Sequence, residues 1–153
     1  MRDAKLKQIY DMIDALDVRV EFGELPADRD GEYLHDALLI RIQHDLLTRS
    51  YRSTIAHECA HAVFADVPSK FGPVNAKQER RADEWAALRL IDISDYRHEE
   101  DRHDGHIEGM AIALNVTVEI VEAFRRVLLR VGQDVYVAPK MGAGQWMHRV
   151  EVA

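Results

Sequence analysis

Residues 53–64 read STIAHECAHAVF, and a helix through this segment places His57 and His61 one turn apart on the same face. Two imidazoles at that spacing can direct nitrogen atoms at one metal ion, and Zn²⁺ suits neutral imidazole ligands. Glu58 lies about 100° around the helix from His57, beside such an ion rather than on it. There its carboxylate can accept a proton from a water held by the metal. The HExxH pattern therefore predicts a catalytic zinc centre.

The residues around the motif distinguish a metal-binding helix from a chance pair of histidines. They are small or apolar, which predicts that the helix is largely buried. Buried histidine and glutamate side chains are costly unless a partner satisfies them, and a metal ion does so. The only cysteine of the chain falls on the far side of the helix, and we interpret it as a packing residue rather than a nucleophile. The surrounding residues are Ile55, Ala56, Cys59, Ala60, Val63 and Phe64.

A catalytic zinc site needs three protein ligands and an open position. The pattern HExxHxxGxxH, in which a third histidine follows shortly, is excluded because Phe64 and Val67 occupy its glycine and histidine positions. A glutamate on the next predicted helix is the other common arrangement, and Glu79 is our predicted third ligand. Asp83 shares its face and is expected to accept the remaining N–H of a ligand histidine, outside the metal's own ligands. Glu84 is the alternative ligand.

Composition indicates one globular domain over residues 1–153. Of the 153 residues, 47% are hydrophobic and 31% are charged. The net charge of −7 argues against nucleic acid as the main partner, since phosphate binding needs a basic surface. We find no membrane-spanning run and no secretion signal, and a single cysteine excludes an internal disulfide. We expect a cytoplasmic protein that contacts neither membranes nor nucleic acid directly.

Hydrophobic periodicity predicts an α+β fold. We expect residues 1–50 to form a helix and a small sheet, residues 51–130 to form a helical part that carries the site, and residues 131–153 to form a tail or short strands. The two predicted strands, 18–22 and 37–43, are interpreted as a hairpin-like pair. The predicted helices cover residues 3–16, 50–65, 76–91, 105–114 and 118–130.

The segment 92–106, DISDYRHEEDRHDGH, is very polar and is predicted to be an exposed charged loop. Its histidines do not have a recognised ligand spacing, so we leave them out of the metal site. A peptidase needs a group that stabilises the developing oxyanion, and nothing in the sequence chooses among the candidates. These are Tyr96, His98, His103 and His106.

The segments YRSTIAHECAHAVF (51–64) and ERRADEWAALRL (79–90) together resemble the ImmA/IrrE family of zinc metallopeptidases. The family's signature is HExxH followed by E-x-x-A-x-x-F-A. Glu79, Ala82 and Ala86 match it, and Trp85 takes the aromatic position. The likeness covers residues 35–130, and it departs at LRLIDIS (88–94), where the family has a Leu-Met-Pro-like element.

The resemblance implies a small zincin-like domain of the gluzincin type. It assigns His57, His61 and Glu79 as ligands of one zinc ion, with Glu58 as the catalytic acid and base. Family members of the phage and mobile-element type are site-specific endopeptidases that often cut a helix-turn-helix repressor. We expect the substrate to lie extended along the edge of the sheet that contains residues 37–43.

Two other functions remain as alternatives. The protein can be a zinc-binding regulatory partner of a repressor or antitoxin system without protease activity. Residues 111–128, AIALNVTVEIVEAFRRVL, have a helix-turn-helix appearance that suggests a DNA-binding module. Glu119 and Glu122 argue against DNA binding, because they open the would-be recognition helix and would repel phosphates.

Overall fold

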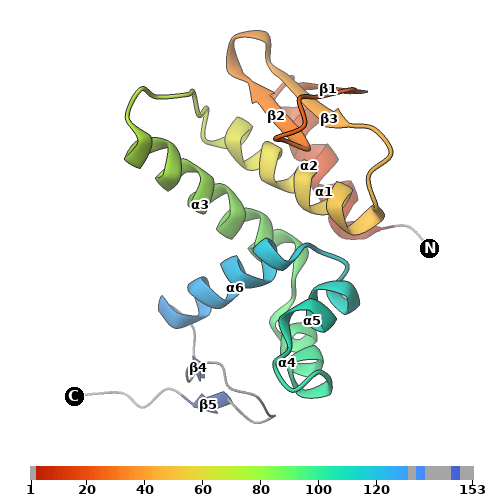
Figure 1. Cartoon of the computed structure of the whole chain (residues 1–153), viewed down its shortest axis with the longest axis vertical. Helices are drawn as coiled ribbons and strands as arrows, with labels where there is room; N and C mark the ends of the chain where they lie inside the picture. The colour runs from red at the N-terminus through yellow and green to blue at the C-terminus, as the bar shows by residue number, and fades with distance from the viewer. Residues whose placement is uncertain (1–2, 131–133, 137–145, 149–153) are drawn as a thin grey trace.

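The computed structural model describes residues 3–130, 134–136 and 146–148, and within them the fold is α+β as predicted (Figure 1). Six helices accompany a three-stranded sheet and a separate two-stranded pair. The helices are α1 Ala4–Ala15, α2 Thr48–Val63, α3 Gly72–Leu90, α4 Ile93–Arg102, α5 Ile107–Leu114 and α6 Val118–Arg130, with a short 3-10 turn at His35–Ala37. The strands are β1 Arg19–Gly23, β2 Gly31–Leu34, β3 Leu39–Gln43, β4 Asp134–Tyr136 and β5 Trp146–His148.

The three-stranded sheet has the order β1-β3-β2, so the predicted hairpin is wrong. β1 and β3 run parallel, and the antiparallel neighbour of β3 is β2, a strand that the sequence did not reveal. β2 has only four residues and begins with a glycine, which leaves little alternation to detect. The connection to β3 passes through the 3-10 turn and through Leu38, whose backbone is left-handed with φ 47°. Among the residues that the structure describes, β3 is therefore central and β2 has a free edge.

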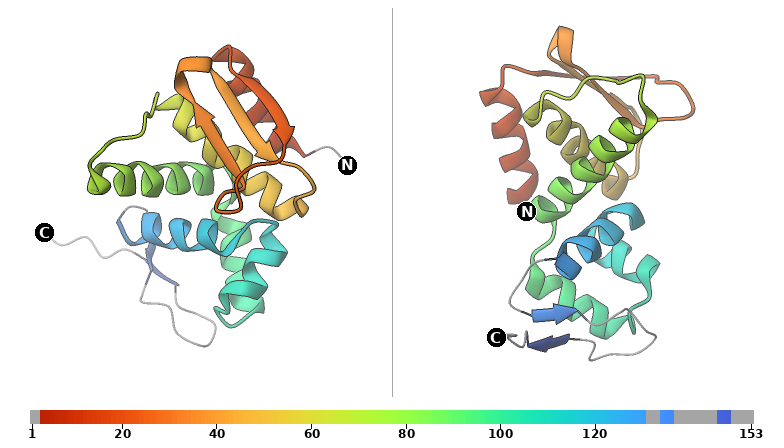
Figure 2. Two further views of the ribbon diagram at one scale, coloured as in Figure 1. Left: turned by 45° about the horizontal axis from the view of Figure 1, so that its top comes forward. Right: turned by 90° about the vertical axis from the view of Figure 1, so that its left-hand side faces the viewer.

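Helix α2 runs through the centre of the molecule between the sheet, α1 and α3 (Figures 1 and 2). Ile55 and Cys59 on α2 are fully buried, as are Ile40 and Ile42 on the sheet. α3 packs closely on α2 because Ala82 and Ala86 are also fully buried and carry no bulky side chain. α6 in turn lies alongside α3, as both views in Figure 2 show. The predicted burial of the HExxH helix and of Cys59 is confirmed.

Segment 93–102 forms helix α4, which corrects the prediction of an exposed charged loop. Its buried face consists of Tyr96 and Glu100, four residues apart, whose side chains contact at 3.3 Å. Two buried positions among so many charges are too few for a periodicity signal. β4 and β5 pair antiparallel, in agreement with the expected short strands of the tail. The glycine-rich segment between them lies outside the described residues.

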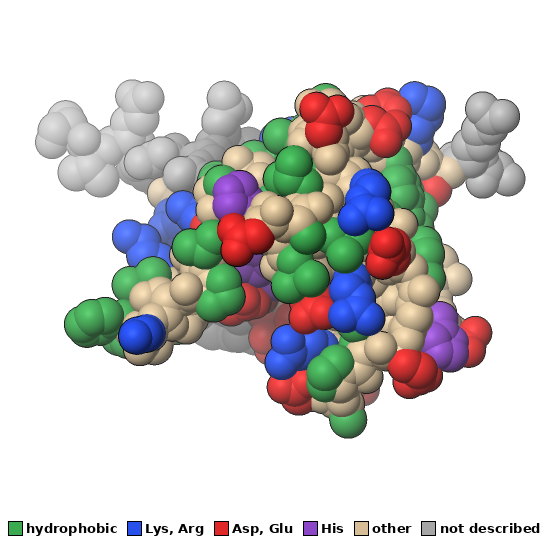
Figure 3. All heavy atoms as spheres, turned by 90° about the horizontal axis from the view of Figure 1, so that it is seen from above, with side chains coloured by type: hydrophobic (Ala, Val, Ile, Leu, Met, Phe, Trp, Pro, Cys, Tyr) green, Lys and Arg blue, Asp and Glu red, His purple; other side chains and the backbone are tan. Residues whose placement is uncertain are grey.

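The surface over the three-stranded sheet carries acidic, basic and hydrophobic side chains side by side (Figure 3). This face shows no extended basic patch of the kind that nucleic-acid binding requires. In the described part of the chain, no helix combines the length and apolar composition that crossing a membrane requires.

Asp3 joins α1 to α2, and its removal is expected to destabilise the fold. Its carboxylate caps α1 at the N–H of Leu6 (3.1 Å) and pairs with Arg52 Nε at 2.6 Å. Because Arg52 is buried, Asp3→Asn should lower the free energy of unfolding by about 2 kcal/mol in urea titrations at pH 7. The exposed pair Lys7–Asp11 supplies a control, since Asp11→Asn should change stability little.

The same pair predicts a pH dependence. Burial raises the pKa of Asp3, but hydrogen bonds from Arg52 and from the backbone outweigh it, and the net shift is downward. A lowered folded-state pKa stabilises the protein above the ordinary carboxyl pKa of about 4, and this contribution is lost as the pH falls through the folded-state value. The stability difference between wild type and Asp3→Asn should therefore shrink below about pH 4. A difference that stays constant with pH would contradict the ion-pair assignment.

Candidate metal centre

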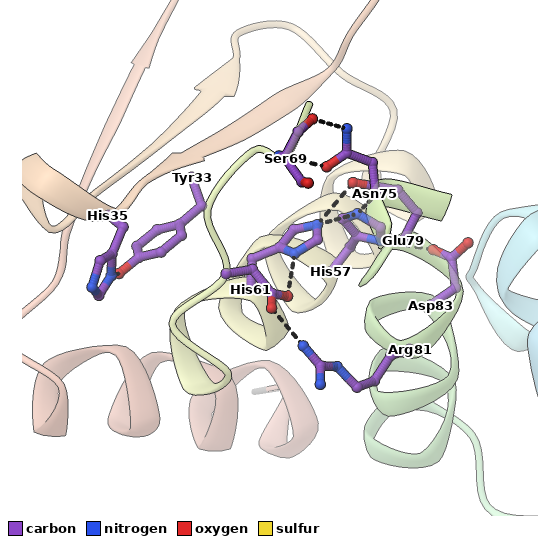
Figure 4. A network of polar contacts seen from close by, with 10 residues as sticks. Tyr33, His35, His57, His61, Ser69, Asn75, Glu79, Arg81 and Asp83 are labelled. Atoms are coloured by element: carbon purple, nitrogen blue, oxygen red, sulfur yellow. Dashed lines mark hydrogen bonds and ion pairs between the residues drawn. The ribbon is translucent and has the colours of Figure 1, made fainter. Parts of the chain in front are cut away.

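Three side chains from α2 and α3 converge on one point (Figure 4). His57 Nε2 lies 3.1 Å from His61 Nε2. Glu79 reaches both, with Oε2 at 2.9 Å from His57 Nε2 and Oε1 at 3.2 Å from His61 Nε2. One candidate ligand atom from each of the three residues lies within 4.8 Å of the others. The structure thus brings together the three residues that the sequence proposed as ligands.

A carboxylate fixes the orientation of each histidine ring. Asp83 Oδ1 lies 2.7 Å from His57 Nδ1, the position that the sequence suggested for it. Asp66 Oδ2 lies 2.9 Å from His61 Nδ1, and sequence reasoning missed this contact. Both Nδ1 atoms are therefore occupied, and both Nε2 atoms are left to face Glu79.

Asp66 is itself held in place from α3. Arg81 Nη2 contacts Asp66 Oδ1 at 2.5 Å, and the Arg81 guanidinium lies 4.0 Å from the centre of the Phe64 ring. The chain turns sharply before Asp66, because Ala65 has a left-handed backbone with φ 52°. The only signal in the sequence is an aspartate shortly after the predicted end of the helix.

The charges at the centre shift several pKa values. Burial lowers the pKa of His57, but the hydrogen bonds to Asp83 and Glu79 have the larger effect and raise this pKa to about 10. The two histidines hold the pKa of Glu79 far below its usual range. Burial raises the pKa of Glu58, and the neighbouring histidines oppose that rise only in part. A carboxylate with a raised pKa is suited to accept a proton and then donate it.

The donor set fits a divalent metal ion. Two imidazole nitrogens and one carboxylate oxygen are the ligands of a common catalytic zinc site, which keeps a fourth position open. The aspartates at both Nδ1 atoms are the supporting groups that such ligands usually have. The same three ligands also accept other transition metals, so the geometry indicates a metal site without selecting the metal.

Two clefts meet at the centre and share Gly31, Glu58 and Glu79 along their walls. The larger, of about 500 Å³, extends along β2 past Tyr33 and Leu34. The smaller, of about 330 Å³, opens toward the start of α6. Glu58 is only 6% exposed and borders both, so a molecule that spans the clefts would pass directly over its carboxylate.

The free edge of β2, rather than β3, faces this groove. Gly31 allows the close approach, because a Cβ atom there would lie 2.5 Å from Thr54 Cγ2 and 3.1 Å from Glu58 Cγ. β2 is an edge strand of the sheet that contains 37–43, and β3 has a neighbour on both sides. The outer edge of β2 is therefore the edge to which the expected position of an extended substrate applies, and that position stays a prediction.

The remaining candidates from the sequence are not part of the centre. Glu84 points to α6, where Arg130 Nη1 contacts its Oε1 at 2.5 Å, so it is not an alternative ligand. Tyr96 is fully buried against α6, with its hydroxyl 2.7 Å from Arg125 Nε. Neither Tyr96 nor any of the three histidines His98, His103 and His106 borders either cleft, so their suggested oxyanion role is wrong. Tyr33 does border the larger cleft, and its hydroxyl contacts His35 Nδ1 at 2.8 Å.

Comparisons with known proteins agree with this geometry. A family model described as the IrrE N-terminal-like domain, Peptidase M78, matches residues 13–124. No curated protein matches the chain. Among solved structures, a Mycobacterium tuberculosis transcriptional regulator superposes with a TM-score of 0.60 at 17% sequence identity. The match covers 86% of this chain and 44% of that one, so the chain spans less than half of the regulator's length, and the likeness concerns the fold alone.

Asp66 should contribute to metal affinity. Asp66→Ala removes the carboxylate that orients His61, and we expect it to weaken zinc binding by about 10- to 100-fold in competition titrations with a chelator. Asp66→Asn keeps an acceptor oxygen and should fall between this variant and wild type. His57→Ala should lose stoichiometric metal, whereas Asp95→Asn, an exposed site on α4, should bind like wild type. Unchanged affinity in Asp66→Ala would contradict the positioning role.

Proposed function

Since the chain belongs to the IrrE N-terminal-like family of peptidases, we propose that it is a zinc-dependent endopeptidase that cuts a regulatory partner protein at a specific site. One observation supports this proposal more strongly than any other. A buried glutamate, Glu58, borders a groove directly beside a His-His-Glu cluster whose ring orientations are fixed by aspartates. That arrangement suits metal-assisted hydrolysis of a peptide bond.

Some residues of the site would hold the metal ion, and another would transfer the proton. His57, His61 and Glu79 would hold the ion, which supplies a Lewis acid for the scissile carbonyl and the attacking water. The Glu58 carboxylate would accept a proton from that water and pass it to the leaving amide nitrogen. The raised pKa of Glu58 favours the second half of this transfer, because the protonated carboxyl persists until the amine leaves.

The free edge of β2 would bind the peptide. An extended segment can add to this edge through main-chain hydrogen bonds, and the side chains then alternate between the groove and solvent. Because Gly31 borders both clefts, the peptide would cross Glu58 near the start of β2. Main-chain pairing gives affinity for any extended segment, so specificity would come from the cleft walls.

The proposed partner is a helix-turn-helix repressor, and the proposed location is the cytoplasm, where such a repressor acts. The choice of a repressor as partner comes from the family resemblance. The fold shared with a transcriptional regulator fits a role in gene control. The alternative is a non-proteolytic zinc-binding partner of a repressor or antitoxin system, which would use the same groove to bind a peptide without cutting it.

Glu58→Gln separates the two functions. We expect co-expression of the wild-type protein with the helix-turn-helix repressor encoded nearest to it to yield repressor fragments, seen by mass spectrometry. Glu58→Gln should leave the repressor intact while the zinc content stays stoichiometric, because Glu58 is not among the converging ligand atoms. An intact repressor that co-purifies with both proteins would support the non-proteolytic alternative instead.

Gly31→Ala should impair cleavage without loss of metal. The new methyl group would overlap Thr54 and crowd Glu58, which moves β2 away from the centre. A displacement of this kind should slow cleavage by about 10- to 100-fold. Gly23→Ala is the matched control, since a Cβ atom there meets nothing within 4 Å. Adding Thr54→Ser should restore part of the activity, and a full-activity Gly31→Ala protein would disprove the packing argument.

A further inference from the structure

The start of α3 and the loop before it carry exposed hydrophobic side chains. Phe71 is 73% exposed, more than any other large hydrophobic residue that the structure describes. Val67 and Val74 are 49% and 45% exposed. Phe71 immediately precedes α3, and Val74 follows it by three residues in the first turn of the helix. This part of the chain projects at the left of Figure 1. Neighbouring apolar side chains left in water mark a surface that a partner covers.

The same segment carries cations that have no partner in the described part of the chain. Lys70, Lys77 and Arg80 are exposed, and none of them forms a hydrogen bond, an ion pair or a ring contact with a described residue. Every other lysine and arginine that the structure describes has a partner. Acidic residues outnumber basic ones by 27 to 20, yet residues 67–78 contain no aspartate or glutamate. Positive charge is therefore concentrated at one place on an acidic protein.

These residues are continuous with one wall of the larger cleft. Val67 borders the cleft, and so do Asn75 and Gln78, which lie on α3 between the exposed positions. Ser69 is bonded to Asn75 through both its backbone N–H and its carbonyl, which holds the loop against the helix. A chain that leaves the cleft over this wall would pass directly onto the exposed side chains. We call this region the α3 surface, and it consists of Val67, Lys70, Phe71, Val74, Lys77 and Arg80.

We propose that the α3 surface binds an acidic segment of the partner protein that also contains apolar side chains, next to the stretch that the groove holds. The inference rests on the proposed peptidase function and adds a contact area outside the groove. Charge complementarity selects the occupant, because three unpaired cations attract carboxylates and orient the segment that carries them. Phe71 is the expected central contact, since an exposed aromatic side chain can contribute much of the binding energy of an interface.

The combination of charge and apolar area favours a protein over a nucleic acid or a membrane. A phosphate backbone would neutralise the cations but would leave Phe71 and Val74 without an apolar partner. An anionic membrane would attract these three cations and repel the rest of a chain whose net charge is −7. Because main-chain pairing at β2 admits any extended segment, a second contact area would also help to select one protein.

Charge reversal on the α3 surface tests the proposal by binding, without requiring cleavage. The zinc-loaded Glu58→Gln chain is titrated by calorimetry with the helix-turn-helix repressor encoded nearest to it. Adding Lys77→Glu/Arg80→Glu, or Phe71→Ser alone, should weaken binding by roughly 5- to 30-fold. Raising the salt to about 0.5 M should reduce the effect of charge reversal but not that of Phe71→Ser. In the cleaving chain, charge reversal should raise KM while kcat stays within about twofold.

Lys7→Glu/Arg19→Glu is the matched control. It changes the net charge equally, and both side chains are 67% exposed and lie outside the groove, on α1 and β1. The repressor should bind this variant within about twofold of its affinity for the parent chain.

A photo-crosslinker tests the chemistry of the bound segment. p-Benzoylphenylalanine in place of Phe71 should crosslink to a repressor segment that has more aspartate and glutamate than lysine and arginine, as identified by mass spectrometry. In place of Phe22, an exposed phenylalanine on β1, it should not crosslink to that segment.

Unchanged affinity after charge reversal, or a crosslink to a segment without excess acid, would overturn this inference and leave the peptidase function standing. Wild-type binding to a DNA duplex, or to vesicles with about 30% phosphatidylserine, would also overturn it if charge reversal abolishes that binding. A wild-type chain that neither binds nor cuts the repressor would reject the proposed function, and this inference would fail with it.

Discussion

Two aspartate–histidine hydrogen bonds determine which atoms meet at the centre of this molecule. An imidazole offers two nitrogens, and a carboxylate at Nδ1 leaves Nε2 as the one available for a ligand. Asp83 does this for His57, and Asp66 does it for His61. Glu79 and Asp83 lie one turn apart on α3. The same helix therefore supplies one candidate ligand, Glu79, and the carboxylate that orients a second one, His57. The geometry of the site therefore depends on how α3 sits on α2.

Small residues set the distances between the elements that build the site. Ala82 and Ala86 let α3 approach α2, and Gly31 lets β2 approach the same helix from another side. The burial of apolar residues along α2 provides the stabilisation that offsets a cluster of charged groups. Rigid elements packed in this way hold functional side chains more accurately than loops do.

The parts of the site that were predictable from sequence are those governed by helical periodicity. The spacing from His57 to His61, and from Glu79 to Asp83, places each pair on one face whatever the rest of the fold does. Asp66 was not predictable because its position depends on a left-handed turn at Ala65, and nothing local requires an alanine to adopt that conformation.

The errors in the predicted fold also arise from features that no local sequence pattern determines. Strand pairing is non-local, so the order β1-β3-β2 could not follow from two strands and a turn signal. The free edge of β2 was missed with the strand itself. Glu84 was a plausible ligand by residue type, but it follows Asp83 by one position and therefore faces α6 instead of α2. Helix α4 was not predicted because its buried face consists of only two residues, which give too weak a periodic pattern.

The segment between Asp66 and the start of α3 can change in length with less effect on the metal centre than the elements around it. Asp66 is fixed by His61 and Arg81, and Ser69 is bonded to Asn75 through both its backbone N–H and its carbonyl. Val67 and Pro68, between these anchors, border the larger cleft and hold none of the converging ligands. Insertions and deletions here would reshape one wall of the groove while the histidines keep their supports. Related chains can thus differ in the molecules that their grooves admit by changing the length of this one loop, while the histidines and their supporting aspartates stay the same.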